Sequence, residues 1–131
     1  MTRYVIGPDV ALRLAVDEAT PPDGIALLAP TLLRSQLLAD VYGAVRRGEL
    51  TRGDAERHLD HVRSLRIRLL GDRVLQKVAW QVAEQLGWEG TFDAEYVALT
   101  RLQADALVTL DERLAAAVRD MVDVAPYDAL R

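Results

Sequence analysis

The stretch Thr91-Phe92-Asp93-Ala94-Glu95-Tyr96-Val97-Ala98-Leu99 carries the strongest fold signal, together with Ala106-Leu107-Val108-Thr109-Leu110-Asp111-Glu112-Arg113-Leu114. In the first stretch, Asp93 stands near the start of an amphipathic helix. In the second, Asp111 comes just where a short apolar strand ends. Acids at the open ends of strands and helices can meet at one edge of a sheet, where they suit a hard cation. Asp93 and Asp111 are therefore the leading candidates for a functional site.

The composition is that of an ordinary globular protein. Of the 131 residues, 50% are hydrophobic and 27% charged, so we expect one domain over residues 1–131. The absence of cysteine excludes disulfides and thiolate metal sites. A net charge of -4 argues against a general field for binding polyanions. No apolar run reaches the ~18 residues of a bilayer span, so we expect a cytoplasmic protein without membrane contact.

Arginines and both histidines are concentrated in residues 46–73. They are Arg46, Arg47, Arg52, Arg57, His58, His61, Arg63, Arg66, Arg68 and Arg73. Such a belt can meet a phosphate backbone locally, whereas a solvated helix face is the commoner interpretation and the one we favour. His58 and His61 have the spacing of a helical metal pair, but without a third ligand they are better interpreted as exposed polar residues.

Strand and helix patterns alternate along the chain. Strands are expected at Arg3–Ile6, Ile25–Ala29, Ile67–Leu70, Ala106–Thr109 and Val122–Ala125. Helices are expected at Val10–Val16 with Asp9 as cap, from Thr31 to about Arg47, from Thr51 to about Ser64, and at Asp72–Leu86, Phe92–Gln103 and Asp111–Arg119. This alternation predicts an α/β fold with a mainly parallel sheet, whose ligands gather beyond the carboxyl ends of the strands.

Two interpretations of Asp93 and Asp111 are open at this point. Carboxylates around Mg²⁺, which keeps several of its waters, suit attack of a metal-activated water on a phosphodiester. Alternatively, both aspartates are only helix caps, each stabilising its helix by ~1 kcal/mol. Position alone favours caps, and the flanking residues shift the balance. No P-loop, G-x-G-x-x-G or G-x-S-x-G motif is present, which argues against nucleotide-cofactor and serine-hydrolase functions.

The flanking residues resemble the PIN-domain family. Phe92–Leu99 resembles its segment D-A-x-Y-x-A-L, and Val108–Leu114 is similar to its T-x-D-x-x-L segment. Ala29–Ser35 is similar to the P-x-L-x-x-E entry to the second helix, and Tyr4-Val5-Ile6 to the opening strand. The resemblance covers nearly the whole chain. It implies a PIN-like fold, with a mainly parallel central sheet of four to five strands flanked by helices.

Only two of the family's four acidic positions carry over. Asp93 and Asp111 match the third and fourth acids, whereas Gly7 and Gln36 occupy the first and second positions. By the resemblance, Asp93 and Asp111 are the catalytic and metal-binding residues, and the amide oxygen of Gln36 completes part of the shell. Thr109, at the end of its strand, is a further candidate ligand.

Two neighbouring acids are candidates to replace the missing ones. Asp9 lies two residues after Gly7, which in extended chain displaces its carboxylate by ~6–7 Å. Asp40 lies one helical turn beyond Gln36, ~6 Å along the axis. Either acid can act on a metal-bound water rather than on the ion itself. We count Asp9 among the candidate metal residues.

The resemblance implies a VapC-type toxin of a type II toxin–antitoxin system. Such a protein is a Mg²⁺-dependent endoribonuclease, forms a homodimer and is neutralised by a VapB-like antitoxin. With Gly7 and Gln36 in acidic positions, we expect a weakened site that needs high Mg²⁺ or prefers Mn²⁺. The apolar faces of the helices at 31–47 and 51–64 are the expected antitoxin groove.

Two alternatives stay open. A catalytically inactive PIN-domain module that binds antitoxin or RNA is favoured by the joint loss at Gly7 and Gln36. An unrelated α/β domain with two capping aspartates is the plainer one. Among the aromatic residues, Trp88 and Tyr96 are candidates to stack on bases, whereas Trp80 lies in an apolar helical pattern and is assigned to the core.

Overall fold

A computed structural model describes residues 1–131, and its strands and helices alternate along the chain. The elements are β1 (Thr2–Ile6), α1 (Pro8–Val16), β2 (Ile25–Pro30), α2 (Leu33–Arg46), α3 (Arg52–Ser64), β3 (Arg68–Leu70), α4 (Arg73–Leu86), α5 (Phe92–Gln103), β4 (Ala106–Val108), α6 (Glu112–Val118), β5 (Val124–Ala125) and a final 3-10 helix (Tyr127–Leu130). Every expected strand and helix is present, with boundaries shifted by one or two residues. The 3-10 helix was not expected.

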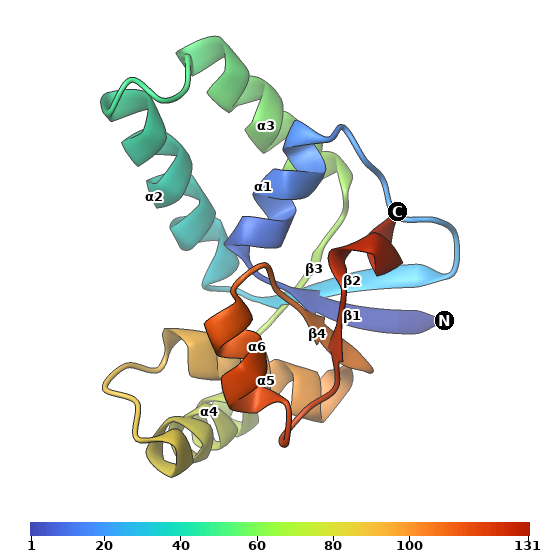
Figure 1. Ribbon diagram of the computed structural model, residues 1–131, viewed down its shortest axis with the longest axis vertical. Helices are drawn as coiled ribbons and strands as arrows, with labels where there is room; N and C mark the ends of the chain where they lie inside the picture. The colour runs from blue at the N-terminus through green and yellow to red at the C-terminus, as the bar shows by residue number, and fades with distance from the viewer.

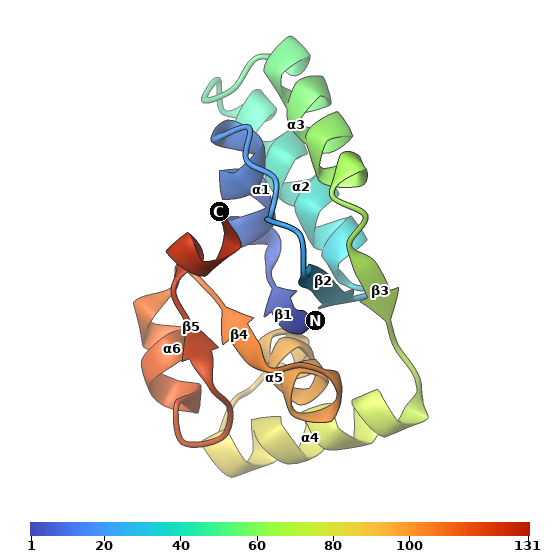
Figure 2. The ribbon, with the colours of Figure 1, turned by 90° about the vertical axis from the view of Figure 1, so that its right-hand side faces the viewer.

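The five strands form one sheet in the order β3-β2-β1-β4-β5, and all neighbouring pairs are parallel (Figure 1; all five strands are labelled in Figure 2). The mainly parallel α/β fold is therefore confirmed. The chain builds outward from β1 in one direction through β2 and β3, and in the other through β4 and β5. The strand order reverses between β1 and β4, which is where open α/β sheets form their ligand crevice.

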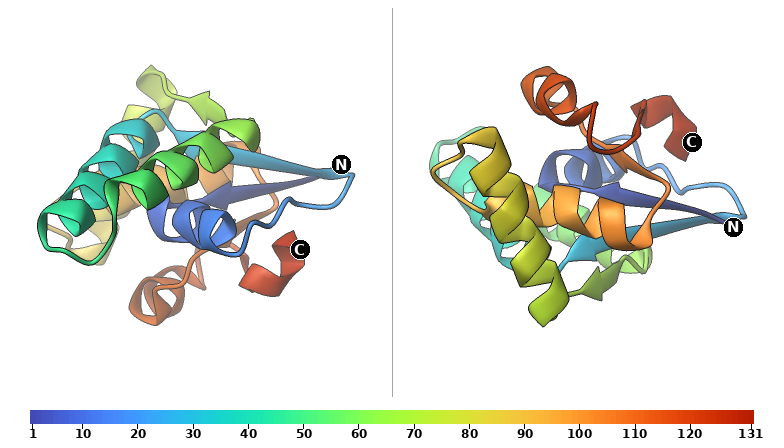
Figure 3. Two further views of the ribbon diagram at one scale, coloured as in Figure 1. Left: turned by 90° about the horizontal axis from the view of Figure 1, so that it is seen from above. Right: turned by 90° about the horizontal axis from the view of Figure 1, so that it is seen from below.

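Helices cover both faces of the sheet, and each face has its own core. Val5 belongs to the cluster that includes residues of α4 and α5, whereas the next residue, Ile6, belongs to the cluster formed with α1, α2 and α3. This division follows from the two-residue period of a strand, whose side chains point alternately to the two faces. Figure 2 shows the two layers above and below the sheet, and Figure 3 shows α4 and α5 from below.

Several helix ends follow the expected chemistry. Thr51 caps α3 by accepting a hydrogen bond from the Asp54 N–H, and Gly87 ends α4 with a left-handed φ of 68°. Thr31, in contrast, is not the cap of α2. Leu32 takes that position without a side-chain bond, and the Thr31 N–H donates to the Leu70 carbonyl, so the helix begins later than expected.

Trp80 was wrongly assigned to the core. Its side chain is 66% exposed, and its Nε1–H donates to Glu84 one turn along the helix. The buried face of α4 consists of Leu75, Ala79, Val82 and Ala83. Trp80 is one residue off this stripe, and the rotation of ~100° per residue carries it to the outer face.

The arginine belt is largely a helix face in water. On α3, Arg52, Arg57 and Arg63 each pair with an acid on the same helix. His61 ties α3 to the loop after α1, because its Nε2 lies 2.8 Å from the Ala19 carbonyl oxygen. None of the helices combines the length and apolarity needed to cross a membrane.

Candidate functional site

The candidate site lies where β1 and β4 end and where the starts of α1, α2, α5 and α6 approach one another (Figure 1). A pocket of about 270 Å³ opens there, which we call the acid pocket. Its polar lining residues are Asp9, Gln36, Asp40, Asp93, Tyr96, Thr109 and Asp111, and Gly7 also lines it. All five candidate site residues of the sequence analysis are thus brought together, and no Lys, Arg or His is among the lining residues.

Asp93 is not a helix cap. Thr91 holds the N-cap position of α5, and Asp93 stands in the first turn, facing the acid pocket. Burial raises the pKa of its carboxyl above the ordinary value, and the charges of Asp111 and Asp9 raise it further. Burial and neighbouring negative charge both disfavour the ionised carboxylate, so a cation beside Asp93 would stabilise it.

Asp111, by contrast, is the N-cap of α6. Its Oδ1 accepts hydrogen bonds from the N–H groups of Arg113 at 2.9 Å and Leu114 at 3.2 Å. The capping interpretation is therefore right for this aspartate. Because both bonds go to Oδ1, the second oxygen, Oδ2, is the one left for a ligand. Asp111 can cap α6 and serve the acid pocket at once.

Asp9 occupies the space beside Gly7. Its Oδ1 lies 3.0 Å from the point where a Cβ at position 7 would stand. We expected the carboxylate ~6–7 Å away on the basis of an extended chain. The chain instead turns into α1 at Pro8, with Gly7 as the N-cap, so Asp9 lies in the first helical turn and is not a cap itself. A helical turn, unlike an extended strand, brings this side chain back over the strand end.

A hydrogen-bonded turn holds Asp9 against the end of β4. Its Oδ2 accepts the Leu110 N–H at 2.9 Å and the Thr109 hydroxyl at 3.3 Å. The Thr109 hydroxyl in turn accepts the Asp111 N–H at 3.1 Å. The Thr109 hydroxyl therefore connects the acids at positions 9 and 111.

Gln36 is held by Tyr96, an interaction that sequence reasoning missed. The Tyr96 hydroxyl donates to Gln36 Oε1 at 2.6 Å. Burial raises the pKa of Tyr96 above its ordinary value, and nearby carboxylates, Glu95 first, raise it further, so the phenol stays a donor. Tyr96 is only 3% exposed and cannot stack on a base. The Gln36 oxygen has a second lone pair left for a ligand.

The donor set suits a hard cation that keeps most of its water. No group of three or more His, Asp or Glu side chains is close enough to hold an ion by protein ligands alone. Mg²⁺, however, usually binds one or two carboxylates and retains several waters. Asp93 and Asp111 are two carboxylates that line the same pocket, together with Asp9 and Gln36.

Comparison with known proteins links the chain to solved structures only. No family model and no curated protein matches it. The crystal structure of PAE2754 from Pyrobaculum aerophilum superposes with a TM-score of 0.73 at 22% identity, over 98% of this chain and 93% of that one. VapBC2 from Rickettsia felis, solved bound to a DNA fragment from their promoter, gives 0.68 at 13% identity, over 95% and 98%. At such identities the likeness establishes the fold, and this chain has the PIN-like fold of VapC toxins.

Proposed function

We propose that the protein is a divalent-cation-dependent endoribonuclease of the VapC toxin type, with water as the attacking group. The observation that carries the proposal is the acid pocket itself. Asp9, Asp93 and Asp111 share it at the crossover between β1 and β4, and no positively charged residue lines it. Within this cluster, Asp9 and Asp111 accept hydrogen bonds from the protein, whereas burial and the charges of Asp111 and Asp9 raise the pKa of Asp93. Acids with perturbed pKa values are concentrated at functional sites.

Each residue has a distinct part in this proposal. A bound Mg²⁺ or Mn²⁺ would make a hydroxide-like nucleophile and neutralise charge on the phosphodiester. Asp93 and Asp111 hold the ion, and Gln36 offers a fixed carbonyl oxygen. Asp9, anchored by Leu110 and Thr109, orients water beside the ion.

The pocket has less negative charge than four acids would give. Gly7 contributes no side chain, and Gln36 is neutral, whereas Asp9 adds a carboxylate close to position 7. We therefore expect weak ion binding, with saturation only at high Mg²⁺ and a preference for Mn²⁺. Because protonated Asp93 holds an ion poorly, and its pKa is raised in the ion-free protein, we expect ion binding to weaken in acid at a higher pH than an ordinary aspartate would dictate.

A second surface fits the proposed VapB-like antitoxin. A groove of about 610 Å³ runs between α2 and α3, where the sequence placed it. Apolar residues such as Leu38 and Leu59 line it together with Arg34 and Arg66. Apolar lining with arginines suits an amphipathic segment carrying acidic residues. Leu38→Asp should abolish binding of such a partner, because it places a charge in the apolar lining of the groove. The proposed homodimer is a separate question, which light scattering tests.

RNA cleavage is the direct test. Wild type and Asp93→Asn are compared on a structured RNA with Mg²⁺ or Mn²⁺, and Asp123→Asn, an exposed aspartate outside the acid pocket, is the matched control. We expect Asp93→Asn alone to lose cleavage. Thermal unfolding gives a second readout, because an ion that binds only the folded state raises Tm. Cleavage that persists in Asp93→Asn would refute the proposal.

One observation favours a second candidate function. The Gln36 oxygen already accepts the Tyr96 hydroxyl, and no three acidic or histidine ligands converge. An inactive module that binds antitoxin or RNA would keep the fold and the groove without a working centre. It is distinguished by partner binding with neither RNA cleavage nor a rise of Tm in divalent cations.

A further inference from the structure

A second hollow opens directly beside the acid pocket. It measures about 770 Å³ and is formed by the loop between α4 and α5, the first turn of α5 and Gln36 of α2. We call it the α4–α5 hollow. Gln36 and Asp93 line both this hollow and the acid pocket, so the two adjoin at these residues.

An aromatic ring lies exposed in the α4–α5 hollow. This ring belongs to Phe92, the residue before Asp93 and the only phenylalanine in the chain, and it is 60% exposed. Trp88 also lines the hollow and packs against the core that α4 and α5 share. Burying a phenylalanine side chain stabilises a protein by ~1.5–3 kcal/mol, so a ring left in water next to a functional pocket is available for a ligand.

Charge limits what that ligand is. Glu89 and Asp93 line the hollow, and no Lys, Arg or His does. A phosphate group is repelled there, whereas a neutral, flat group finds an aromatic surface and carboxylate acceptors. A nucleobase has this character, since each base has a π-face and several carry amino groups that donate to carboxylates.

The start of α5 adds further polar groups. No side chain caps this helix, and Thr91, its N-cap residue, lines the hollow. The first N–H groups of a helix have no partner within it. They can donate to the carbonyl or ring-nitrogen acceptors of a base that reaches them.

We infer that the α4–α5 hollow receives one unpaired nucleobase of an RNA, stacked on Phe92, beside a phosphodiester at the acid pocket. The inference deepens the proposed function and rests on it for the identity of the ligand. It adds to that function a contact between the Phe92 ring and the face of the base next to the cut. A paired base cannot offer its face to the ring, so fully double-stranded RNA is a poor substrate. Bases with an exocyclic amino group are favoured by Glu89.

Binding to a short RNA hairpin tests the inference without cleavage. The hairpin carries 2-aminopurine, which loses fluorescence on stacking, at each unpaired loop position in turn. Ca²⁺ replaces Mg²⁺, and a gel checks that the RNA stays intact. We expect quenching at one loop position, which Phe92→Ala abolishes while weakening affinity roughly tenfold or more. Phe92→Tyr should keep both the quenching and the affinity. Trp80→Ala should keep both as well, because Trp80 is an exposed aromatic residue outside the hollow.

An abasic nucleotide at the quenched position completes the cycle. The abasic RNA should bind wild type more weakly than the intact RNA does, by the same factor by which Phe92→Ala weakens binding of the intact RNA. Phe92→Ala should bind the abasic and the intact RNA equally well. If removal of the base and removal of the Phe92 ring each weaken binding and their effects multiply, the two do not contact each other and the inference is overturned. Unchanged RNA affinity in Phe92→Ala, or no binding of the hairpin to wild type, would also overturn it. If Phe92→Ala instead weakens binding of a basic peptide and not of RNA, the hollow binds protein, and the inference is wrong.

A cleavage assay on the same variants separates this inference from the proposed function. Base-dependent binding without any cleavage removes the nuclease proposal and leaves the stacking site. Cleavage with the same KM and kcat in wild type and Phe92→Ala removes the stacking site and leaves the nuclease. If Phe92→Ala loses both base-dependent binding and cleavage, circular dichroism checks that the variant is still folded. Retained binding and cleavage in Phe92→Tyr would then attribute the loss to the missing aromatic ring.

Discussion

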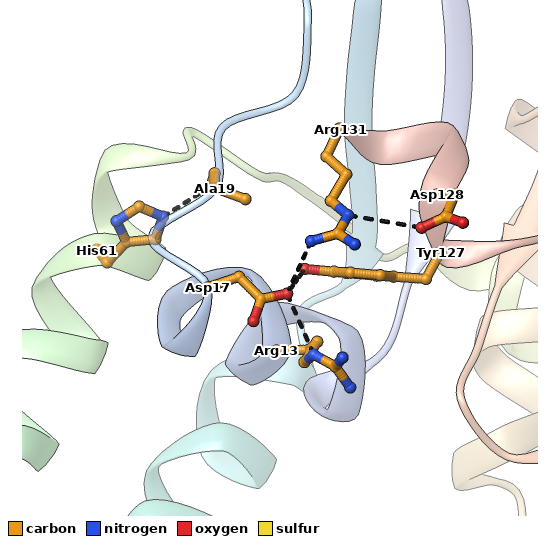
Figure 4. Close-up of polar contacts among 7 residues, drawn as sticks. All are labelled: Arg13, Asp17, Ala19, His61, Tyr127, Asp128 and Arg131. Atoms are coloured by element: carbon orange, nitrogen blue, oxygen red, sulfur yellow. Dashed lines mark hydrogen bonds and ion pairs between the residues drawn. The ribbon is translucent and has the colours of Figure 1, made fainter.

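Asp17 and Asp93 show two opposite ways of placing an aspartate in this fold. Asp17 ends α1 and accepts hydrogen bonds from the Tyr127 hydroxyl at 2.8 Å and Arg13 at 3.1 Å, while Arg131 lies 3.5 Å away (Figure 4). The Tyr127 bond, more than the arginines, lowers the pKa of Asp17. Asp93 starts α5 among other acids, and its pKa is raised.

Helix dipoles alone would predict the reverse. A carboxylate is stabilised at the start of a helix, where Asp93 lies, and destabilised at the end, where Asp17 lies. Burial first and neighbouring acids second raise the pKa of Asp93, whereas the Tyr127 hydrogen bond is the largest cause of the lowered pKa of Asp17. The contact around Asp17 joins the final 3-10 helix to α1. The guanidinium carbons of Arg131 and Arg13 also lie 5.3 and 5.4 Å from the centre of the Tyr127 ring. Asp17 is paired with groups of the protein, whereas Asp93 faces a pocket lined by other acids.

The largest expected effect is at Asp111, where charge and capping can be separated. Asp111→Asn keeps an N-cap side chain but removes the charge, so cleavage should fall by more than about a hundredfold while Tm barely changes. Asp111→Ala should lose about 1 kcal/mol of stability as well. Asp72→Asn, at the N-cap of α4, is the control and should cleave normally. Full cleavage by Asp111→Asn would reduce Asp111 to a structural cap and break the contrast with Asp17.

A somewhat smaller effect is expected at Asp9. Asp9→Asn can still accept the Leu110 N–H, but it loses the charge beside the ion, which should cost roughly 10- to 100-fold in cleavage rate. Gly7→Asp added to Asp9→Asn should restore part of the cleavage rate, because it returns a carboxylate to this space, although the side chain at position 9 must shift to admit it. In the wild-type background the same shift is needed and the Asp9 carboxylate is already present, so Gly7→Asp should gain less. Unchanged cleavage in Asp9→Asn would exclude Asp9 from the site.

Sequence reasoning predicted the fold better than the geometry of the site. Strand and helix signals are local, so the alternation and the parallel sheet followed from periodicity and turn residues. The place of Asp9 depends on one backbone choice, because α1 begins at Pro8 instead of after Asp9. The bond between Tyr96 and Gln36 joins residues 60 positions apart, and no local pattern encodes it. Trp80 was misplaced because an apolar residue one step off a buried stripe looks the same in sequence.

The contribution of the Asp17 hydrogen bond to stability is tested by Tyr127→Phe, which removes the hydroxyl that donates to Asp17. We expect Tm at neutral pH to fall by roughly 2–6 °C. A lowered folded-state pKa gives stability that is present above the unfolded pKa and lost as pH falls through the folded pKa. The difference between variant and wild type should therefore shrink in acid. Tyr42→Phe, at an exposed tyrosine on α2, is the control. An equal loss at every pH would assign the effect to packing.

The smallest effect, and the one of opposite sign, is expected for the stability of Asp93→Asn. A raised folded-state pKa means that the folded protein holds its proton more tightly, so ionised Asp93 costs stability once the pH exceeds that pKa. Below the unfolded pKa the group is neutral in both states and costs nothing. Asp93→Asn should therefore raise Tm at neutral pH, by an amount of order 1 °C because solvent screens a half-exposed acid, and the gain should vanish in acid.

The matched variant Asp17→Asn should lower Tm at neutral pH, since it removes a carboxylate that the protein has paired. Opposite signs for the same substitution would separate the acid kept for a ligand from the acid used in folding, without reference to RNA. A loss of stability in Asp93→Asn would mean that the fold itself satisfies Asp93. A divalent cation adds the decisive comparison. It should raise the Tm of wild type and of Asp17→Asn but not that of Asp93→Asn, because only the last lacks the unpaired charge that draws the ion.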